Sequence, residues 1–289
     1  MVDSKSRLVN YDVLRSLSCI SIIMLHISSV YYGDTSSIPN VSTYSYYLSY
    51  FLNGIVRFAV PVFVMLSGAF NLSNLQNKNI RYFYKKIIIK IIVPTVAFGL
   101  LYSAFSFLMG RSIITVLCNF LKGNPYYHMW YMFMIIGLFL ITPFLIVLLE
   151  KYQISANHIF WTSLIITIGG YGSDHLFNWD LSYSISYLGY YLLGYTIFNS
   201  TKQKDNFEGF IYVVAGFFVE LISLAIGFIV YHKGYFTMLN SNYLAPQSPV
   251  TYLASYLIFT GFARFSFRGF MLFKYISKYS LYIYICGMR

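Results

Sequence analysis

The sequence has few charged residues. Asp, Glu, Lys and Arg make up 10% of its 289 residues, and only 9 residues are acidic. Soluble domains carry roughly a quarter charged residues, so this chain lacks the charge that a water-facing surface requires. Hydrophobic residues instead account for 58% of the chain. The composition therefore excludes a soluble globular protein and predicts a surface that faces lipid.

Cysteines and long polar segments are also scarce. The three cysteines, Cys19, Cys118 and Cys286, are far apart in the sequence. Their spacing matches neither a disulfide framework nor a metal site. The longest stretches between apolar runs, residues 110–128 and 232–248, are too short to bury a core of their own. We therefore expect no bound metal and no separate soluble domain.

Long apolar runs dominate the chain, and nine of them approach the length needed to cross a hydrocarbon core of ~30 Å. The first is longer than the core of a cleavable signal peptide, so it is expected to span the bilayer. The sequence predicts an all-α, polytopic membrane helix bundle that forms a single domain over residues 1–289. The runs cover residues 8–30, 50–72, 87–109, 129–149, 156–172, 183–199, 209–231, 249–264 and 270–287.

The basic residues are distributed unequally between the two sides of the membrane. If the first helix runs outward, only Arg111, Lys122 and Lys233 fall in outer loops. Cytoplasmic segments carry an excess of Lys and Arg, so this asymmetry places the N-terminus in the cytoplasm. The pattern also lacks the interleaved stacking aromatics of a nucleic-acid surface, and no nucleic-acid partner is expected. The inner side receives Lys5, Arg7, Lys78, Arg81, Lys85, Lys86, Lys90, Lys151, Lys202, Lys204, Arg264, Arg268, Lys274 and Lys278.

The first apolar run contains three ionisable residues, Asp12, Arg15 and His26. An ionisable side chain inside a span costs on the order of 2.5 to 3.5 kcal/mol, so each requires a partner or a function. Asp12 and Arg15 have the spacing of an interfacial ion pair. Arg15 and His26 share a helix face about 16 Å apart. His26 suits proton transfer, although a histidine can also serve only as a hydrogen-bond donor inside a bundle.

The second apolar run adds Arg57, Pro61, Ser67 and Gly68. Arg57 could stabilise developing negative charge, or it could extend to the outer headgroups. Ser67 and Gly68 are small residues that allow a neighbouring helix to approach closely.

A basic segment and an aromatic one complete the candidate residues. Arg81, Lys85, Lys86 and Lys90 form an inner basic cluster, which either attracts anionic lipid or binds the phosphates of a cytosolic cofactor. His128 and Trp130 stand at the outer start of the fourth run, where tryptophan commonly anchors a helix at the interface.

Several of these segments resemble the integral-membrane acyltransferase family 3, whose members O-acylate cell-envelope and secreted glycans. The stretch "NYDVLRSLSCISIIMLH" is similar to the family's first helix, in which an arginine is followed after ten residues by a histidine, here Arg15 and His26. The stretch "RFAVPVFVMLSGAF" is similar to its second helix and matches Arg57, Ser67 and Gly68 to family positions. Later helices are matched less specifically by "HMWYMFMIIGLFLITPFL" and "YLGYYLLGY".

The resemblance implies a bundle of about ten helices in a bacterial plasma membrane. It implies transfer of an acyl group, usually acetyl, from acyl-coenzyme A to a glycan hydroxyl. His26 is then the general base or a transient acyl carrier, Arg15 orients a substrate, and Arg57 contacts the oxyanion or the acceptor. The basic cluster from Arg81 to Lys90 would bind the donor. Asp12, Ser67, His128 and Trp130 would contact substrate.

Two other functions are compatible with the residues. A secondary transporter also uses buried Arg, Asp and His, although the helices show few of the central Gly and Pro interruptions typical of one. A membrane sensor or scaffold would keep the bundle without catalysis.

The family's closing motif contains a His that "SLYIYICGMR" lacks, so the chain is expected to be short of a C-terminal helix.

Overall fold

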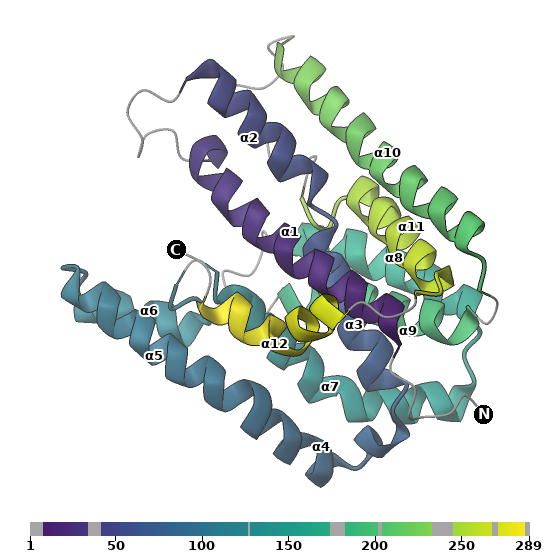
Figure 1. Cartoon of the computed structure of the whole chain (residues 1–289). Helices are drawn as coiled ribbons and strands as arrows, with labels where there is room; N and C mark the ends of the chain where they lie inside the picture. The colour runs from purple at the N-terminus through teal and green to yellow at the C-terminus, as the bar shows by residue number, and fades with distance from the viewer. Residues whose placement is uncertain are drawn as a thin grey trace. The chain divides into compact units, whose positions relative to one another are not determined.

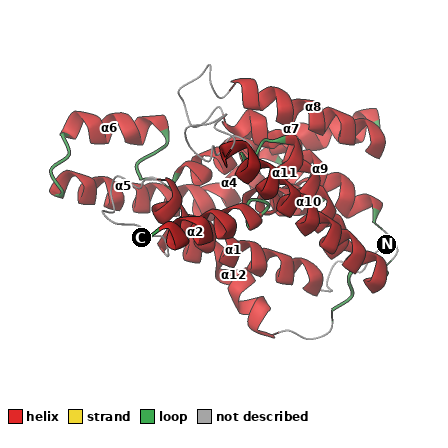
Figure 2. Ribbon diagram, turned by 90° about the horizontal axis from the view of Figure 1, so that it is seen from above, coloured by secondary structure: helices red, strands yellow, loops and turns green. Residues whose placement is uncertain are grey.

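The structure is a computed structural model that describes residues 8–33, 42–126, 128–173, 183–201, 204–232, 245–267 and 271–286. The regular secondary structure of these residues is entirely helical, as Figure 2 shows, which confirms the all-α class. The helices are α1 Val9–Gly33, α2 Thr43–Ile55, α3 Ala59–Leu72, α4 Ile80–Ile87, α5 Val93–Leu108, α6 Ile113–Lys122, α7 Trp130–Tyr152, α8 Ala156–Ser173, α9 Tyr183–Ser200, α10 Asn206–His232, α11 Pro249–Arg264 and α12 Met271–Cys286.

Helices lie within all nine expected runs, and the chain is a multi-pass membrane protein. By length and composition, five segments of the described residues can cross a bilayer: Val9–Val30, Thr43–Leu72, Ile80–Leu108, Trp130–Tyr152 and Asn206–Ile229. The other four runs correspond to α8, α9, α11 and α12, which have 16 to 18 residues each. Five of the basic residues counted for topology, Lys5, Arg7, Lys202, Lys233 and Arg268, lie outside the described residues.

The expected helix over residues 50–72 is interrupted, which corrects its boundaries. A turn at residues 56–58 separates α2 from α3. Pro61 has no N–H to donate to the carbonyl of residue 57 four positions earlier, and its ring crowds that carbonyl. Arg57 therefore lies in the break between the two helices, and Pro61 stands in the first turn of α3, where its missing N–H costs no helical hydrogen bond.

The basic segment and the outer segment that follows it are also more ordered than expected. The helix predicted to begin at residue 87 begins at Ile80, so Arg81, Lys85 and Lys86 lie on α4 and not in a loop. A π-helical turn, Ile88–Ile92, joins α4 to α5 and contains Lys90. Within the expected outer loop, α6 starts at an N-cap serine, Ser112, and ends at Gly123 in the left-handed conformation.

The chain divides into two compact units, one of Met1–Leu66 with Ile197–Arg289 and one of Ser67–Thr196. In the first unit, α12 and α2 pack on α1, and α10 and α11 lie side by side, as can be followed in Figure 1. A Cβ atom at Gly261 would lie 2.6 Å from the carbonyl oxygen of Gly209, so these two glycines let α10 and α11 approach to backbone contact.

In the second unit, α4, the π turn and α5 form one long helix, and α6 lies beside α5 (Figure 2). The interior of this unit contains the fully buried rings of Tyr187, Tyr190 and Tyr191 on α9. The Tyr191 hydroxyl and Thr142 Oγ1 on α7 are 2.8 Å apart. This hydrogen bond satisfies the Tyr191 hydroxyl inside the unit, where lipid could offer no partner.

Candidate active site

Helix α1 carries three of the predicted site residues, Asp12, Arg15 and His26, on one continuous helix. Arg15 and His26 are both partly buried. Their separation of eleven residues corresponds to about three turns, so they lie on nearly the same face, roughly 16 Å apart along the axis. The predicted common stripe is therefore compatible with the observed helix, with Arg15 toward its N-terminal end.

Asp12 is bound to α12. Its Oδ1 accepts a hydrogen bond of 2.6 Å from Ser277 Oγ. One turn further along α1, Ser16 Oγ donates to the carbonyl of Phe273 at 2.8 Å. These contacts fix the inner half of α1, and hence Arg15, against a neighbouring helix.

Lys204 adds a basic group at the inner end of α1. Its Nζ donates a hydrogen bond to the Ala263 carbonyl and lies 5.9 Å over the ring of Tyr11. Partial burial lowers the pKa of the Lys204 ammonium from its ordinary value. A positive charge is therefore held close to the start of the helix that carries Arg15.

Asn53 on α2 is the centre of a polar network beside His26. Its side chain is fully buried, and its Nδ2 donates to the Leu25 carbonyl at 3.0 Å, to Ser28 Oγ at 3.1 Å and to Ser29 Oγ at 2.9 Å. The three acceptors flank His26 on both sides in the sequence. Asn53 therefore connects α2, by hydrogen bonds, to the turn of α1 that contains His26.

Arg57 belongs to the same network. Its Nη2 donates a hydrogen bond to Asn53 Oδ1, and Arg57 itself is only partly exposed. The guanidinium thus points toward a buried side chain and does not extend to the outer headgroups. Of the two alternatives that the sequence leaves open for Arg57, the structure favours a place inside the bundle.

Glu220 on α10 is a residue that sequence reasoning missed. It is fully buried, and its helix packs on α2, the helix that precedes Arg57. The signal was present, because Glu220 is the only charged residue between positions 209 and 231 of a long apolar run. An isolated carboxylate in such a run indicates a function or a buried partner.

In the described residues, no group of three or more His, Cys, Asp or Glu could hold a metal ion.

The remaining predicted residues lie in the second unit. Ser67 accepts a hydrogen bond at its carbonyl from Asn71 Nδ2 at 3.0 Å. Its neighbour Gly68 packs against α9, where a Cβ would lie 1.9 Å from the Tyr191 carbonyl oxygen. Gly68 thus allows α3 and α9 to pack closely.

The basic cluster on α4 and the π turn presents both exposed and anchored charge. Arg81, Lys85 and Lys90 are exposed. Lys86 is half-buried, its Nζ lying 3.4 Å from Asn77 Oδ1 and 5.7 Å from the Phe83 ring centroid. Lys86 and Lys90 repel each other electrostatically. Like charges one turn apart destabilise a helix slightly, and a bound anion would remove that cost.

His128 and Trp130 pack among aromatic rings. His128 is fully buried in the turn before α7, and its ring stands edge-on to Tyr102 at 5.2 Å and to Tyr126 at 5.5 Å. Trp130 begins α7, and its ring centroid is 5.9 Å from that of Tyr187 on α9. The two residues therefore anchor the start of α7 within the unit.

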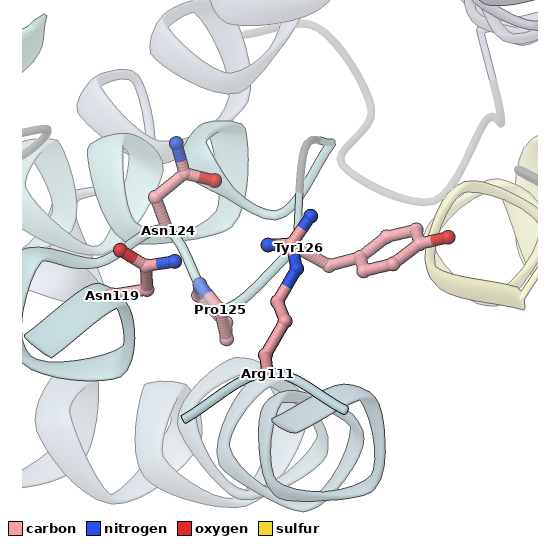
Figure 3. A pocket seen from close by; sticks show the side chains of 5 residues that line it. All are labelled: Arg111, Asn119, Asn124, Pro125 and Tyr126. Carbon is pink, nitrogen blue, oxygen red and sulfur yellow. The ribbon is translucent and has the colours of Figure 1, made fainter. Parts of the chain in front are cut away.

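A polar pocket of about 320 Å³ lies between the end of α5 and the segment that follows α6. Figure 3 shows the Arg111 side chain extending into the space between the Asn119 amide and Tyr126. Asn124 and Pro125 complete the described lining. Among the residues that the structure describes, this lining contains one cation, two amides and an aromatic ring but no carboxylate, so it favours a hydroxyl-rich or anionic ligand.

These features define a polytopic membrane protein whose first spanning helix presents a histidine beside a buried, arginine-containing polar network. The family model described as an acyltransferase domain, that of acyltransferase family 3, matches residues 8–287. The chain therefore belongs to this family and is a membrane acyltransferase. Comparisons with curated proteins and with solved structures give no match.

Proposed function

We propose that this acyltransferase moves an acyl group, usually acetyl, from acyl-coenzyme A to a hydroxyl of an exported or cell-envelope glycan in a bacterial plasma membrane. The observation that supports the proposal is a pair of hydrogen bonds made by Asn53. One goes to the Leu25 carbonyl, next to His26, and the other comes from the guanidinium of Arg57. A titratable imidazole and a fixed cation near one another are the two groups that transfer from a thioester requires.

The reaction balances with the residues of this site. His26 removes the proton from the acceptor hydroxyl, and the oxygen attacks the thioester carbonyl. The tetrahedral intermediate then expels the coenzyme A thiolate, which takes up the proton, so the products are an ester and the free thiol. His26 could instead attack the thioester itself and pass the acyl group on from its ring nitrogen. In both routes Arg57 is assigned to the developing oxyanion.

The donor is assigned to the basic cluster of Arg81, Lys85, Lys86 and Lys90. Changing both Lys86 and Lys90 to glutamine is expected to raise the KM for acetyl-coenzyme A by about tenfold while leaving kcat nearly unchanged, because phosphate contacts bind the donor but do not act on the thioester. Steady-state kinetics in membranes measures this effect. Lys151→Gln removes an exposed inner charge at the end of α7 and is the matched control. An unchanged KM in the double variant would assign the cluster to lipid instead.

The acceptor is assigned to the pocket of Arg111, Asn119 and Tyr126. This pocket follows Leu108, whereas the basic cluster begins at Arg81, so the two lie at opposite ends of a 29-residue helix that is ~43 Å long. That separation supports a cytosolic donor and an outer acceptor.

Loss of the Arg111 charge is expected to weaken acceptor binding selectively. Arg111→Ala should raise the KM for an anionic glycan by about tenfold and change the KM for acetyl-coenzyme A little, because the guanidinium is the cation of the described pocket lining. Lys122→Ala, an outer cation that does not belong to the described lining, is the control. Equal effects of the two variants would mean that the outer surface acts only through its overall charge.

The proposed function is tested by coenzyme A release from acetyl-coenzyme A in membranes that contain the chain. The acceptors are peptidoglycan fragments, teichoic acid and capsular polysaccharide, and acylated glycan is identified by mass spectrometry. Release that depends on both an acceptor and the chain supports the proposal. Solute movement in vesicles without acyl-coenzyme A, together with no release, would support a transporter.

A further inference from the structure

Glu220 lies in the interior of the first unit with no obvious structural task. It is fully buried on the membrane-spanning part of α10, and neither carboxylate oxygen has a hydrogen-bond partner among the residues that the structure describes. Buried charges in proteins are normally paired or used, because each loses its hydration. A buried carboxylate without a hydrogen-bond donor therefore suggests that a cationic side chain lies near it.

The register between α2 and α10 brings Glu220 to Arg57. Tyr50 Oη donates to the Leu224 carbonyl at 3.0 Å, and a Cβ at Gly54 would lie 2.0 Å from Leu224 Cδ2. Arg57 is about one turn beyond Gly54, and Glu220 is one turn before Leu224. Because these contacts fix how the two segments lie against each other, Arg57 and Glu220 come to the same level. The rings of Phe58 and Phe217, whose centroids are 5.4 Å apart, show the same register.

Arg57 is thus connected to the His26 turn through Asn53. Asn53 accepts a hydrogen bond from its guanidinium, and the same asparagine donates to the carbonyl of Leu25, the residue before His26. The register between α2 and α10 places Glu220 at the level of Arg57 on the opposite helix. An arginine without such a counter-charge can extend its long side chain to the headgroups, where its charge is hydrated.

We infer that Glu220 is a positioning residue for acyl transfer, which keeps the Arg57 guanidinium beside the His26 turn and inside the bundle. The inference rests on the proposed function. Arg57 stabilises the oxyanion only if it is in place before the reaction begins, since moving a cation during the reaction would cost part of the gain. Glu220 touches neither substrate, and it acts through Arg57.

The test is a double-mutant cycle in the full chain, with Glu220→Gln, Arg57→Gln and the combination. Glutamine preserves the shape of the glutamate and removes its charge. We expect Glu220→Gln to lower kcat by at least tenfold with little change in the KM for acetyl-coenzyme A. The double variant should be no slower than Arg57→Gln alone, because Glu220 has no effect once Arg57 is absent. Glu208→Gln, on the same helix and paired with Arg264 at 3.0 Å, is the matched control and should keep the wild-type kcat.

Thermal unfolding of the same variants in detergent gives a readout that does not need activity. Each single variant should lower Tm more than the double variant does, because a single change leaves one buried charge without its counterpart. If the Tm shift of the double variant equalled the sum of the two single shifts, Glu220 and Arg57 would not be paired. A wild-type kcat in Glu220→Gln would overturn the positioning role. Coupled Tm shifts in a chain that transfers no acyl group would reject the proposed function and, with it, the positioning role, while leaving the pair itself intact.

Discussion

Replacing His26 by alanine is expected to reduce acyl transfer to the background rate while the protein still folds and inserts. General acid–base catalysis by a positioned side chain contributes about 10²- to 10⁴-fold, and loss of a nucleophilic imidazole removes the covalent route entirely. Coenzyme A release in membranes, normalised to the amount of inserted protein, measures the effect.

The fold should tolerate this change because α1 is fixed by contacts that do not involve the imidazole. Asn10 Nδ2 donates to the Phe262 carbonyl at 2.9 Å, and Ser16 and Asn53 bind the two halves of the helix to its neighbours. His158→Ala is the matched control, since His158 is exposed on α8 and bonded only locally to Ser155 in the described structure. Glycan acylation that persists in the His26 variant would falsify the assigned role.

Gly68→Ala is expected to prevent stable folding of the second unit. The added Cβ would lie 1.9 Å from the Tyr191 carbonyl oxygen and 2.7 Å from its carbonyl carbon. These are backbone atoms inside α9, so no rotamer change can relieve the overlap, and α3 and α9 must separate. Overpacking typically costs about 1 to 3 kcal/mol, and the backbone contact places this variant at the upper end.

A second glycine in the same unit provides the comparison for Gly68. A Cβ added at Gly169 on α8 would meet no described atom within 4 Å, so Gly169→Ala should leave the protein unchanged. Detergent-solubilised Tm and the monodisperse fraction on gel filtration distinguish the two variants. Equal Tm values would show that α3 can shift away from α9 at little cost.

The helices within the nine apolar runs could be predicted from the sequence because length and hydrophobicity indicate which segments can enter a bilayer. The break between α2 and α3 was missed although its cause, Pro61, is visible in the sequence, because hydropathy averages over such an interruption. The short α6 was missed for the opposite reason, since its ten residues are too few to suggest a span.

The candidate site was only partly predictable. Arg15 and His26 follow from their spacing on one helix, which depends on local geometry alone. Asn53 is inconspicuous among the tyrosines of α2, and its three donor contacts arise only once α1 and α2 are packed. Glu220 and Arg57 are far apart in the sequence, and only the register between α2 and α10 brings them to the same level.

The π-helical turn Ile88–Ile92 sets the rotational phase of the helix that links the two membrane faces. Such a turn accommodates one residue more than an α-helical turn, so the segment after it is rotated by roughly 100° relative to an uninterrupted helix. Gly99 on α5 therefore faces Phe120, whose Cε2 would lie 3.1 Å from an added Cβ. The faces that α4 and α5 present are thus set independently, and evolution can change one without the other by gaining or losing a single residue here.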